Sequence, residues 1–265
     1  MISVCILGAA GRMGHCLLRA AQGFDDIRVA SAIEREDHPA LGQDAGTLAG
    51  LGSLGVPIGT FKDAAPSDAI IDFTFHAAVP ANLAQAVATR QAFVLGTTGL
   101  TPEERQAVNE AARAIPIVWA PNMSLGVNIL LDLVRRAAAS LDAGYDIEIV
   151  EMHHRLKKDA PSGTALGLAE AAARGRAVAL DRVAVFGREG MVGERPRGEI
   201  GIHAVRGGDV VGDHTVIFAA DGERVELAHK ASNREAFAKG ALTAARWLKG
   251  RAPGLYTMRD VLGLE

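Results

Sequence analysis

Residues 151–166 bring two histidines and two lysines, which could move a proton or hold an anion, together within sixteen residues, in the order Glu-Met-His-His-Arg-Leu-Lys-Lys-Asp-Ala-Pro-Ser-Gly-Thr-Ala-Leu. Histidine and lysine can give up a proton near neutral pH. The second part of the stretch predicts a helix that begins after Ser162 as its N-cap, so the backbone N–H groups of Gly163 and Thr164 have no partner within the helix. These groups carry the positive end of the helix dipole, and they predict a site for a small anion beside Lys157 and a histidine.

A β-strand is expected immediately before this stretch. Residues 146–151 are predicted to form it, with Ile147, Ile149 and Met152 alternating against Glu148 and Glu151. The adjacent pair His153 and His154 would point to opposite faces of a continuing strand and so would rarely bind one ion. No acidic or histidine partner at helical spacing supports a metal, and none is expected.

Composition sets the broad class of the protein. The chain has 265 residues, 49% hydrophobic and 22% charged, with a net charge of −3. These values are typical of a globular protein with one large domain or two smaller ones, and they give no reason to expect nucleic acid or a membrane surface as a partner. Cys5 and Cys16 lack metal-ligand spacing and are expected to be buried, and so few cysteines in a chain of this length favour a reducing, cytoplasmic location.

The N-terminal segment has the pattern of a dinucleotide-binding β-α-β unit. An apolar strand over residues 2–7 leads into Gly8-Ala-Ala-Gly-Arg-Met-Gly14, a helix to about Gln22, and a second strand that ends before Glu34. Glycines at such a turn let the backbone approach a pyrophosphate, and an acid about 20 residues later can accept hydrogen bonds from a ribose. Ala10 stands where the second glycine of the usual motif would be. Arg12 and Arg35 could attract a 2′-phosphate, so both NADH and NADPH are expected to be accepted.

The alternation of strands and helices continues to about residue 120 and predicts a Rossmann-type, doubly wound parallel sheet. Strands are expected over residues 69–73, 92–95 and 115–120, with helices over 78–90 and after the N-cap Thr101. Ligands of such sheets lie at the carboxyl ends of the strands. That rule places Gly8 to Met13, Gly96 to Thr98 and Ala120 to Met123 along one edge, with Gly96 to Thr98 near the nicotinamide.

The pattern of the second half predicts an α+β domain with an open, mixed sheet. Helices are expected over residues 127–141 and 163–174, and mostly antiparallel strands over 182–186, 199–205, 210–219 and 224–229. His203, His214 and His229 fall in these strands and are interpreted as structural or solvent-facing. Because few helices cover the sheet, a homo-oligomer is expected. A helix over residues 234–249 and a short one over 256–262 are expected to return to the first domain. The predicted dinucleotide-binding domain therefore comprises residues 1–123 and 235–265. Residues 124–234 are predicted to form the domain for substrate binding and oligomerisation.

These motifs together resemble the 4-hydroxy-tetrahydrodipicolinate (dihydrodipicolinate) reductase family along essentially the whole chain. The matching segments are Gly8–Gly14, Glu34-Arg35, Gly96–Gly99, Asn122–Asn128 and Glu151–Leu166, and the last is highly specific. The resemblance implies NAD(P)H-dependent reduction of a cyclic, unsaturated dicarboxylic imine in the diaminopimelate–lysine pathway. It also implies a homotetramer whose second domains pair through their sheets.

The resemblance assigns roles residue by residue. His153 would be the proton donor and acceptor and Lys157 a second proton donor, with Lys158 as the competing lysine, while His154, Gly163 and Thr164 would hold a substrate carboxylate. The dinucleotide would contact Gly8, Ala9, Ala10, Gly11, Arg12, Met13, Glu34, Gly96, Thr97, Thr98, Ala120, Pro121, Asn122 and Met123. Phe75 departs from the pattern, because some members have arginine at the corresponding place, and this leaves the choice between NADH and NADPH open.

Two other functions fit parts of the sequence. An aspartate or homoserine dehydrogenase relative would share the fold, but it would need a different substrate loop from the one that contains the two histidines. A regulator that senses NAD(P) without turnover would have no need for aligned proton donors such as His153 and Lys157. Both alternatives are therefore less favoured than the reductase.

Overall fold

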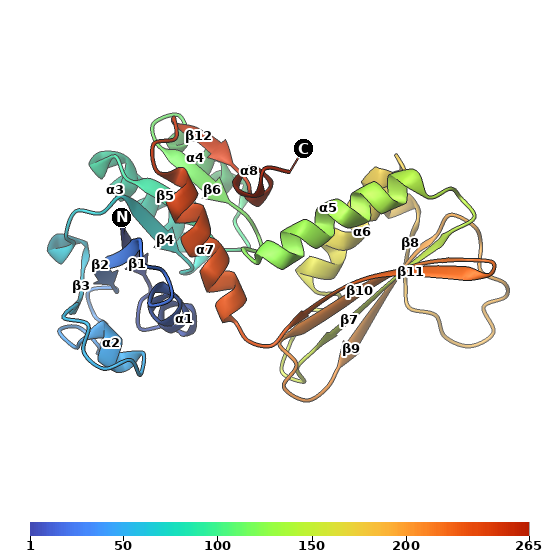
Figure 1. The fold of residues 1–265 in the computed structure, drawn as a ribbon, viewed down its shortest axis with the longest axis horizontal. Helices are drawn as coiled ribbons and strands as arrows, with labels where there is room; N and C mark the ends of the chain where they lie inside the picture. Colours follow the sequence, from blue (N-terminus) through green and yellow to red (C-terminus); the bar gives the residue numbers. More distant parts are fainter. Residues whose placement is uncertain (265) are drawn as a thin grey trace. The chain divides into compact units, whose positions relative to one another are not determined.

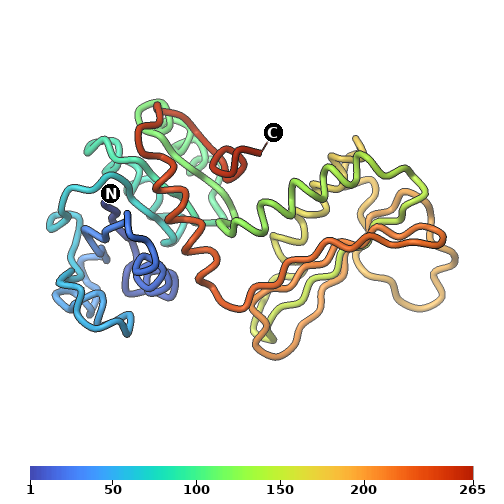
Figure 2. The backbone as a smooth tube through the Cα atoms, viewed as in Figure 1, coloured from blue at the N-terminus to red at the C-terminus, as the bar shows by residue number. Residues whose placement is uncertain are grey.

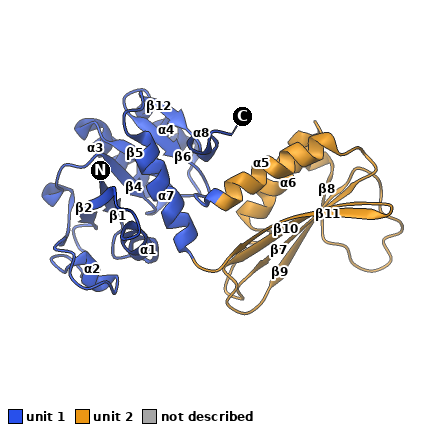
Figure 3. Cartoon of the chain, in the orientation of Figure 1, with its two compact units in different colours: residues 1–125, 234–265 blue, residues 126–233 orange. Residues whose placement is uncertain are grey.

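The chain forms two units in this computed structural model, which describes residues 1–264 (Figure 3). Unit 1 comprises residues 1–125 together with the C-terminal segment from Arg234, and unit 2 comprises Gly126–Asn233. The boundaries expected from the sequence lie after residues 123 and 234, and residue 265 of the first expected domain lies outside the described residues. The dinucleotide-binding and substrate-binding roles of the two units remain predictions at this stage.

Unit 1 is built on a seven-stranded sheet in which every neighbouring pair is parallel (Figure 1). The strands, in spatial order, are β12 (Gly254–Tyr256), β6 (Pro116–Trp119), β5 (Ala92–Leu95), β4 (Ala69–Asp72), β1 (Ile2–Leu7), β2 (Ile27–Ile33) and β3 (Ile58–Gly59). The chain runs outward from β1 in both directions, so the order reverses between β1 and β4. This is the doubly wound topology that the sequence predicted, and ligands of such sheets bind at the reversal.

Helices cover both faces of this sheet. One face packs against α1 (Arg12–Ala21), α2 (Ala45–Leu48) and α7 (Glu235–Leu248), and the other against α3 (Val79–Thr89) and α4 (Pro102–Ala111). The N-terminus of α4 has the predicted capping box, in which Thr101 and Glu104 each accept a backbone N–H of the other. Short 3-10 turns, η1 (Phe61–Asp63) and η2 (His76–Ala78), complete the connections. In residues 1–264, no helix combines the length and apolar character needed to cross a bilayer.

The C-terminal segment returns to the sheet that the N-terminus begins (Figure 2). Helix α7 packs against α1, and residues 254–256 then add the edge strand β12 in parallel to β6. The sequence predicted a single helix over 256–262, which is wrong at its start. Leu255 pairs with Ile117 in the sheet, and only after Thr257 closes a capping box with Asp260 does α8 (Met258–Leu262) begin.

Unit 2 contains a five-stranded mixed sheet in the order β11 (Glu223–Ala231), β10 (Gly212–Ala220), β7 (Asp146–His153), β9 (Ile200–Arg206) and β8 (Ala184–Phe186). β10 is antiparallel to both of its neighbours, whereas β9 is parallel to β7 and to β8. The expectation of mostly antiparallel pairing is therefore corrected. The long connection through α6 (Gly163–Gly175), the 3-10 turn η3 (Leu180–Arg182) and β8 supplies the crossover that a parallel β7–β9 pair needs.

Both helices of unit 2, α5 (Leu125–Ser140) and α6, pack on one face of this sheet (Figure 1). On β7 the buried side chains of that face are Ile147, Ile149, Glu151 and His153. The strand was predicted to end at residue 151, and it continues two residues further, to His153. The prediction that Glu151 belongs to the polar face is wrong. A carboxylate at this position looked solvent-facing because the sequence does not show the partners that neutralise it.

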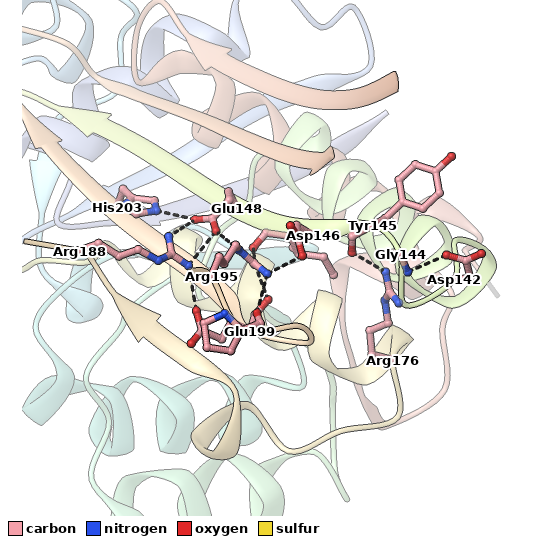
Figure 4. Close-up of polar contacts among 12 residues, drawn as sticks. Asp142, Gly144, Tyr145, Asp146, Glu148, Arg176, Arg188, Arg195, Glu199 and His203 are labelled. Atoms are coloured by element: carbon pink, nitrogen blue, oxygen red, sulfur yellow. Dashed lines mark hydrogen bonds and ion pairs between the residues drawn. The ribbon is translucent and has the colours of Figure 1, made fainter. Parts of the chain in front are cut away.

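The opposite face of β7 carries a network of charges centred on Glu148 (Figure 4). Arg195 Nε lies 2.8 Å from its Oε1, and His203 Nε2 and Arg188 Nη1 lie 2.6 and 3.1 Å from its Oε2. Both arginines belong to the connection between β8 and β9, so Glu148 fixes that connection to the sheet. Burial raises the pKa of Glu148, but the bonds from Arg188, Arg195 and His203 outweigh it and lower the pKa to about 2.

We expect Glu148→Gln to lower Tm by a few degrees at neutral pH, because it leaves charged donors without their acceptor, at a cost of about 1–3 kcal/mol. A folded-state pKa below the unfolded value gives stability that is present above pH 4.5 and is lost as pH falls toward 2. The Tm difference between variant and wild type, measured by calorimetry, should therefore shrink between pH 6 and pH 3. A difference that grows on acidification would contradict this account.

Candidate active site

The glycine loop of unit 1 follows β1 at the point where the strand order reverses. Gly8 has φ +67°, a conformation that side chains with a Cβ rarely adopt. At Gly14, an added Cβ would lie 2.4 Å from the carbonyl oxygens of Gly8 and Ala9, so only glycine lets α1 begin this close to the strand. The N–H groups of the first turn of α1, from Arg12 onward, have no acceptor within the helix. The loop therefore has the shape and the donors to hold a pyrophosphate.

Glu34 lies at the end of β2 and borders a pocket of about 420 Å³. Its Oε1 accepts a hydrogen bond from the N–H of Ala10 at 3.1 Å, so the carboxylate fixes the glycine loop to the strand end. The pocket is also lined by Gly8, Arg35, Lys62, Thr74 and Phe75. Glu36 also borders this pocket, so two acids and two cations surround one cavity. Such a lining suits the ribose half of a dinucleotide, and both residues of the expected pair, Glu34 and Arg35, are part of it.

Phe75 presents an aromatic ring to this pocket where some relatives are expected to have arginine. It is 69% exposed, and its ring centroid lies 4.2 Å from that of His76. Arg35 and Lys62 both border the pocket, but each is paired with an acid: Arg35 Nε lies 2.9 Å from Asp37 Oδ1, and Lys62 Nζ lies 2.7 Å from Glu36 Oε1. The positive charge left for a 2′-phosphate is therefore smaller than the residue types alone suggest.

The other two expected dinucleotide segments meet at the ends of β5 and β6. Thr97, Thr98 and Pro121 line one cavity of about 290 Å³. The side chains of Ala120 and Met123 are buried in the core of unit 1, so contacts from these two residues have to come from the backbone. Asn122 Oδ1 accepts the N–H of Ser124 at 2.8 Å, which holds the turn after β6.

Asp72 is a residue of this edge that the sequence reading missed. It is fully buried and accepts hydrogen bonds from Thr74 N and Oγ1 at 2.7 Å, Asn82 Nδ2 at 2.9 Å and Thr97 Oγ1 at 3.2 Å. One carboxylate thus joins the turns after β4 and β5. The available signal was its position at the end of an apolar strand, where a lone acid has to find donors.

The second group of expected residues lies in unit 2, around the end of β7. His153 is 8% exposed, and its Nδ1 lies 2.6 Å from Oε2 of the fully buried Glu151. The same carboxylate accepts from Arg206 Nη1 at 2.8 Å, Arg206 Nη2 at 2.9 Å and the N–H of Ser162 at 2.9 Å. Burial raises the pKa of Glu151, but these hydrogen bonds outweigh it and hold the pKa below its usual value.

Ser162 caps α6 as predicted, with its Oγ accepting the N–H of Ala165 at 3.2 Å. The same Oγ lies 3.2 Å from Nε2 of His214, whose ring meets that of His153 edge-on at 5.2 Å between centroids. Burial, with the nearby charge of His153 next in size, lowers the pKa of His214 to about 4. His214 is buried, so the solvent-facing alternative for it is wrong, and its structural role stays a prediction for a residue that lies beside His153.

The remaining expected residues follow in the loop between β7 and α6. His154 is partly buried, and its Nδ1 has no hydrogen-bond partner within residues 1–264. Lys157 Nζ lies 3.0 Å from Asp159 Oδ1, and its backbone N–H donates to His154 O at 3.1 Å. Beside Gly163, at the start of α6, the space that a Cβ would take is open. Through Glu151 and Ser162, the helix start that contains Gly163 and Thr164 is fixed to the same strand end as His153.

The chain is similar to one family of known proteins along nearly its whole length. The family model described as Dihydrodipicolinate reductase, N-terminus, matches residues 2–123, and that described as Dihydrodipicolinate reductase, C-terminus, matches residues 126–262. A 4-hydroxy-tetrahydrodipicolinate reductase of Anaeromyxobacter dehalogenans is 50% identical over 100% of this chain and 99% of its own length. That of Ruegeria pomeroyi is 51% identical over 98% of both chains.

Solved structures show the same fold at lower identity. A dipicolinate-bound dihydrodipicolinate reductase from Paenisporosarcina sp. TG-14 superposes with a TM-score of 0.74 at 24% identity, over 98% of both chains. A diaminopimelate dehydrogenase of C. glutamicum reaches a TM-score of 0.54 at 15% identity, over 100% of this chain and 96% of its own. These likenesses concern the fold alone.

Proposed function

The chain belongs to the dihydrodipicolinate reductase family, and we propose that His153 and Lys157 supply the protons for its reaction. It is an NAD(P)H-dependent oxidoreductase that reduces 4-hydroxy-tetrahydrodipicolinate, by way of dihydrodipicolinate, to tetrahydrodipicolinate in the diaminopimelate–lysine pathway. The observation that supports the site assignment is the short contact of His153 with the buried Glu151, at the strand end that also fixes the start of α6.

The substrate is a dicarboxylate, and unit 2 offers donors for its negative charge. The first N–H groups of α6, at Gly163 and Thr164, carry the positive end of a helix dipole, and His154 and Lys157 lie in the loop before them. We assign one substrate carboxylate to Gly163, Thr164 and His154. A cyclic substrate held by its carboxylate would present its ring to the proton donors.

The glycine loop, Glu34 and the turns after β5 and β6 would hold the dinucleotide. The reduced nicotinamide, when bound, supplies a hydride to the conjugated imine. The electron-rich enamine that results on the substrate takes up a proton, and His153 is assigned to deliver it. Lys157, with three N–H donors, can keep its bond to Asp159 while it stabilises the developing charge and donates a proton.

A coupled assay tests the reductase activity. Pyruvate and aspartate semialdehyde would be condensed in situ to the substrate, and NADH or NADPH would be added with the protein. We expect loss of nicotinamide absorbance that depends on all components. Unchanged absorbance with both dinucleotides would reject the reduction itself.

We expect Glu34→Ala to raise the KM for NADH by about 10- to 100-fold with little change in kcat. A hydrogen bond to a charged group contributes about 1.5–3 kcal/mol, and a ribose contact is made in ground and transition states alike. Steady-state kinetics with saturating imine substrate would measure both constants. Glu36→Ala is the matched control, because Glu36 borders the same pocket but pairs with Lys62, and a loss confined to kcat in Glu34→Ala would contradict the ribose role.

We also propose that the protein is a homotetramer in the cytoplasm. Both helices of unit 2 pack on one face of its sheet, and the other face carries exposed apolar side chains such as Val205 next to the Glu148 network. A second copy would cover that face. Cys5 and Cys16 are both buried free thiols, which suits a reducing compartment. Sedimentation as a monomer at micromolar concentration would exclude the tetramer.

A further inference from the structure

We propose that Glu151 is the positioning residue for His153: it holds Nδ1 of the ring and thereby keeps Nε2 as the atom that gives the proton to the substrate. This inference rests on the proposed function for the identity of the reaction, but the contact itself is a property of unit 2. The distance of 2.6 Å between Nδ1 and Oε2 is slightly shorter than the roughly 2.7–2.9 Å usual for a charge-assisted N–H···O bond.

The chemistry follows from which ring nitrogen carries a proton. An imidazolium has protons on both nitrogens, and when Nε2 releases its proton, the neutral ring keeps the other on Nδ1. An ionised Glu151 favours that tautomer, because only a protonated Nδ1 can donate to the carboxylate. Burial raises the pKa of Glu151, but the bonds from Arg206, His153 and Ser162 outweigh it and keep the pKa below its usual value, so the carboxylate is ionised while the ring cycles between its two forms.

The buried position of Glu151 keeps water away from the carboxylate that positions the His153 ring. Its side chain is fully buried, so the charge next to the ring is neither screened by water nor free to rotate away. Arg206 holds it from β9 with two bonds and donates a further bond to the carbonyl of Asp159. The carboxylate therefore has one orientation, and that orientation fixes the ring plane of His153.

Glu151 also sets the distance between the proton donor and the start of α6. Its Oε1 accepts the N–H of Ser162, the N-cap, while its Oε2 takes the ring of His153. The two functions expected of this site, anion binding at Gly163 and proton transfer at His153, thus share one buried anchor. A shift of about 1 Å between such groups can cost a hundredfold in rate.

The charged and titratable groups around the ring act in opposite directions. Glu151 on β7 favours the imidazolium, whereas His214 on β10, Arg206 on β9 and Lys157 in the following loop bring positive charge or a neutral ring to the same place. Replacing Glu151 by glutamine removes the attraction and leaves the charge of Arg206 without its carboxylate partner. Both changes disfavour a protonated His153.

The first test is kinetic. We expect Glu151→Gln to lower kcat by about 10²-fold, and to move the alkaline limb of the kcat profile to lower pH. Glu151→Asp keeps the charge and should recover part of kcat without moving the limb. Combined with His153→Ala, Glu151→Gln should cost at most about twofold more, because no ring remains to be positioned and the glutamine oxygen can still accept the N–H of Ser162.

The second test does not need turnover. Deuterium exchange at the ring carbon Cε1 of each histidine, read by mass spectrometry, depends on pH through the protonation of that ring. We expect the midpoint for His153 to move to lower pH in Glu151→Gln and to stay in place in Glu148→Gln. Glu148 is the matched control, because it lies on the same strand and also pairs with arginine and histidine, here two arginines and one histidine, but on the opposite face of the sheet.

The outcomes separate the two proposals. If wild type fails to oxidise NADH or NADPH, the proposed reaction is wrong, and the exchange midpoint still decides whether Glu151 controls the ring. If the midpoint of His153 is the same in Glu151→Gln and wild type, or if Glu151→Gln lowers kcat equally with and without His153, the positioning role is overturned. A loss of kcat in Glu148→Gln as large as in Glu151→Gln would show a general effect of charge on the sheet, and would overturn it as well.

Discussion

Replacing His153 by alanine is expected to lower kcat by about 10²- to 10⁴-fold, the usual contribution of a general acid. The ring is nearly buried, is held through Nδ1 by Glu151, and stands at the strand end that is joined to the start of α6. Because the proton moves only in the transition state, kcat/KM should fall by the same factor, and the KM for the imine should change little. Steady-state rates with the substrate generated in situ would measure both.

The control for this substitution is His203→Ala. His203 lies in the same sheet and also contacts a glutamate, Glu148, but it belongs to the opposite face and to the network around the β8–β9 connection. Its removal should leave kcat within about twofold of wild type. If His153→Ala retained wild-type turnover while binding dipicolinate normally, His153 would have no part in the proton transfer, and the adjacent His154 would become the candidate.

Much of unit 1 could be predicted from its sequence because local pattern and final position agree there. The glycine loop, the helix after it and Glu34 are set by backbone geometry that short motifs encode, such as the positive φ of Gly8 and the close approach at Gly14. The parallel sheet follows from repeated apolar strands buried on both faces. Asp72 was missed because it is one acid at the end of such a strand, and its three partner side chains come from separate segments.

Unit 2 was harder to predict for a physical reason. A buried carboxylate is stable only with donors around it, and the donors of Glu151 come from β9, 55 residues away in sequence, and from the start of α6, 11 residues away. The alternation along β7 does indicate that Glu151 is buried, because Glu151 and His153 occupy the same alternate positions as Ile147 and Ile149. Glu151 was predicted on the wrong face of the strand because its charge was given more weight than its position in the alternation. A polar pair that continues an apolar alternation is therefore a signal for a buried site.

Lys157→Met is expected to lower kcat by about 10²-fold or more, and Lys158→Met to leave it within about twofold. The two residues are adjacent and chemically identical, so Lys158→Met is the matched control for Lys157→Met. Lys157 is tied into the site: its N–H donates to the carbonyl of His154, and its ammonium, with a side chain only 20% exposed, is held by Asp159 at 2.9 Å. Lys158 is exposed to solvent and lies outside this arrangement.

The loss in Lys157→Met should appear in kcat and also in the KM for the imine, because an ammonium that faces a dicarboxylate contributes to binding as well as to proton transfer. Methionine keeps the length of the stem and removes only the charge and its donors. Kinetics of both variants at saturating NADH would separate the two constants. If Lys158→Met were the impaired variant instead, the loop between β7 and α6 would have to present the other lysine to the ring, and the bond between Lys157 and Asp159 would be a surface pair of little consequence.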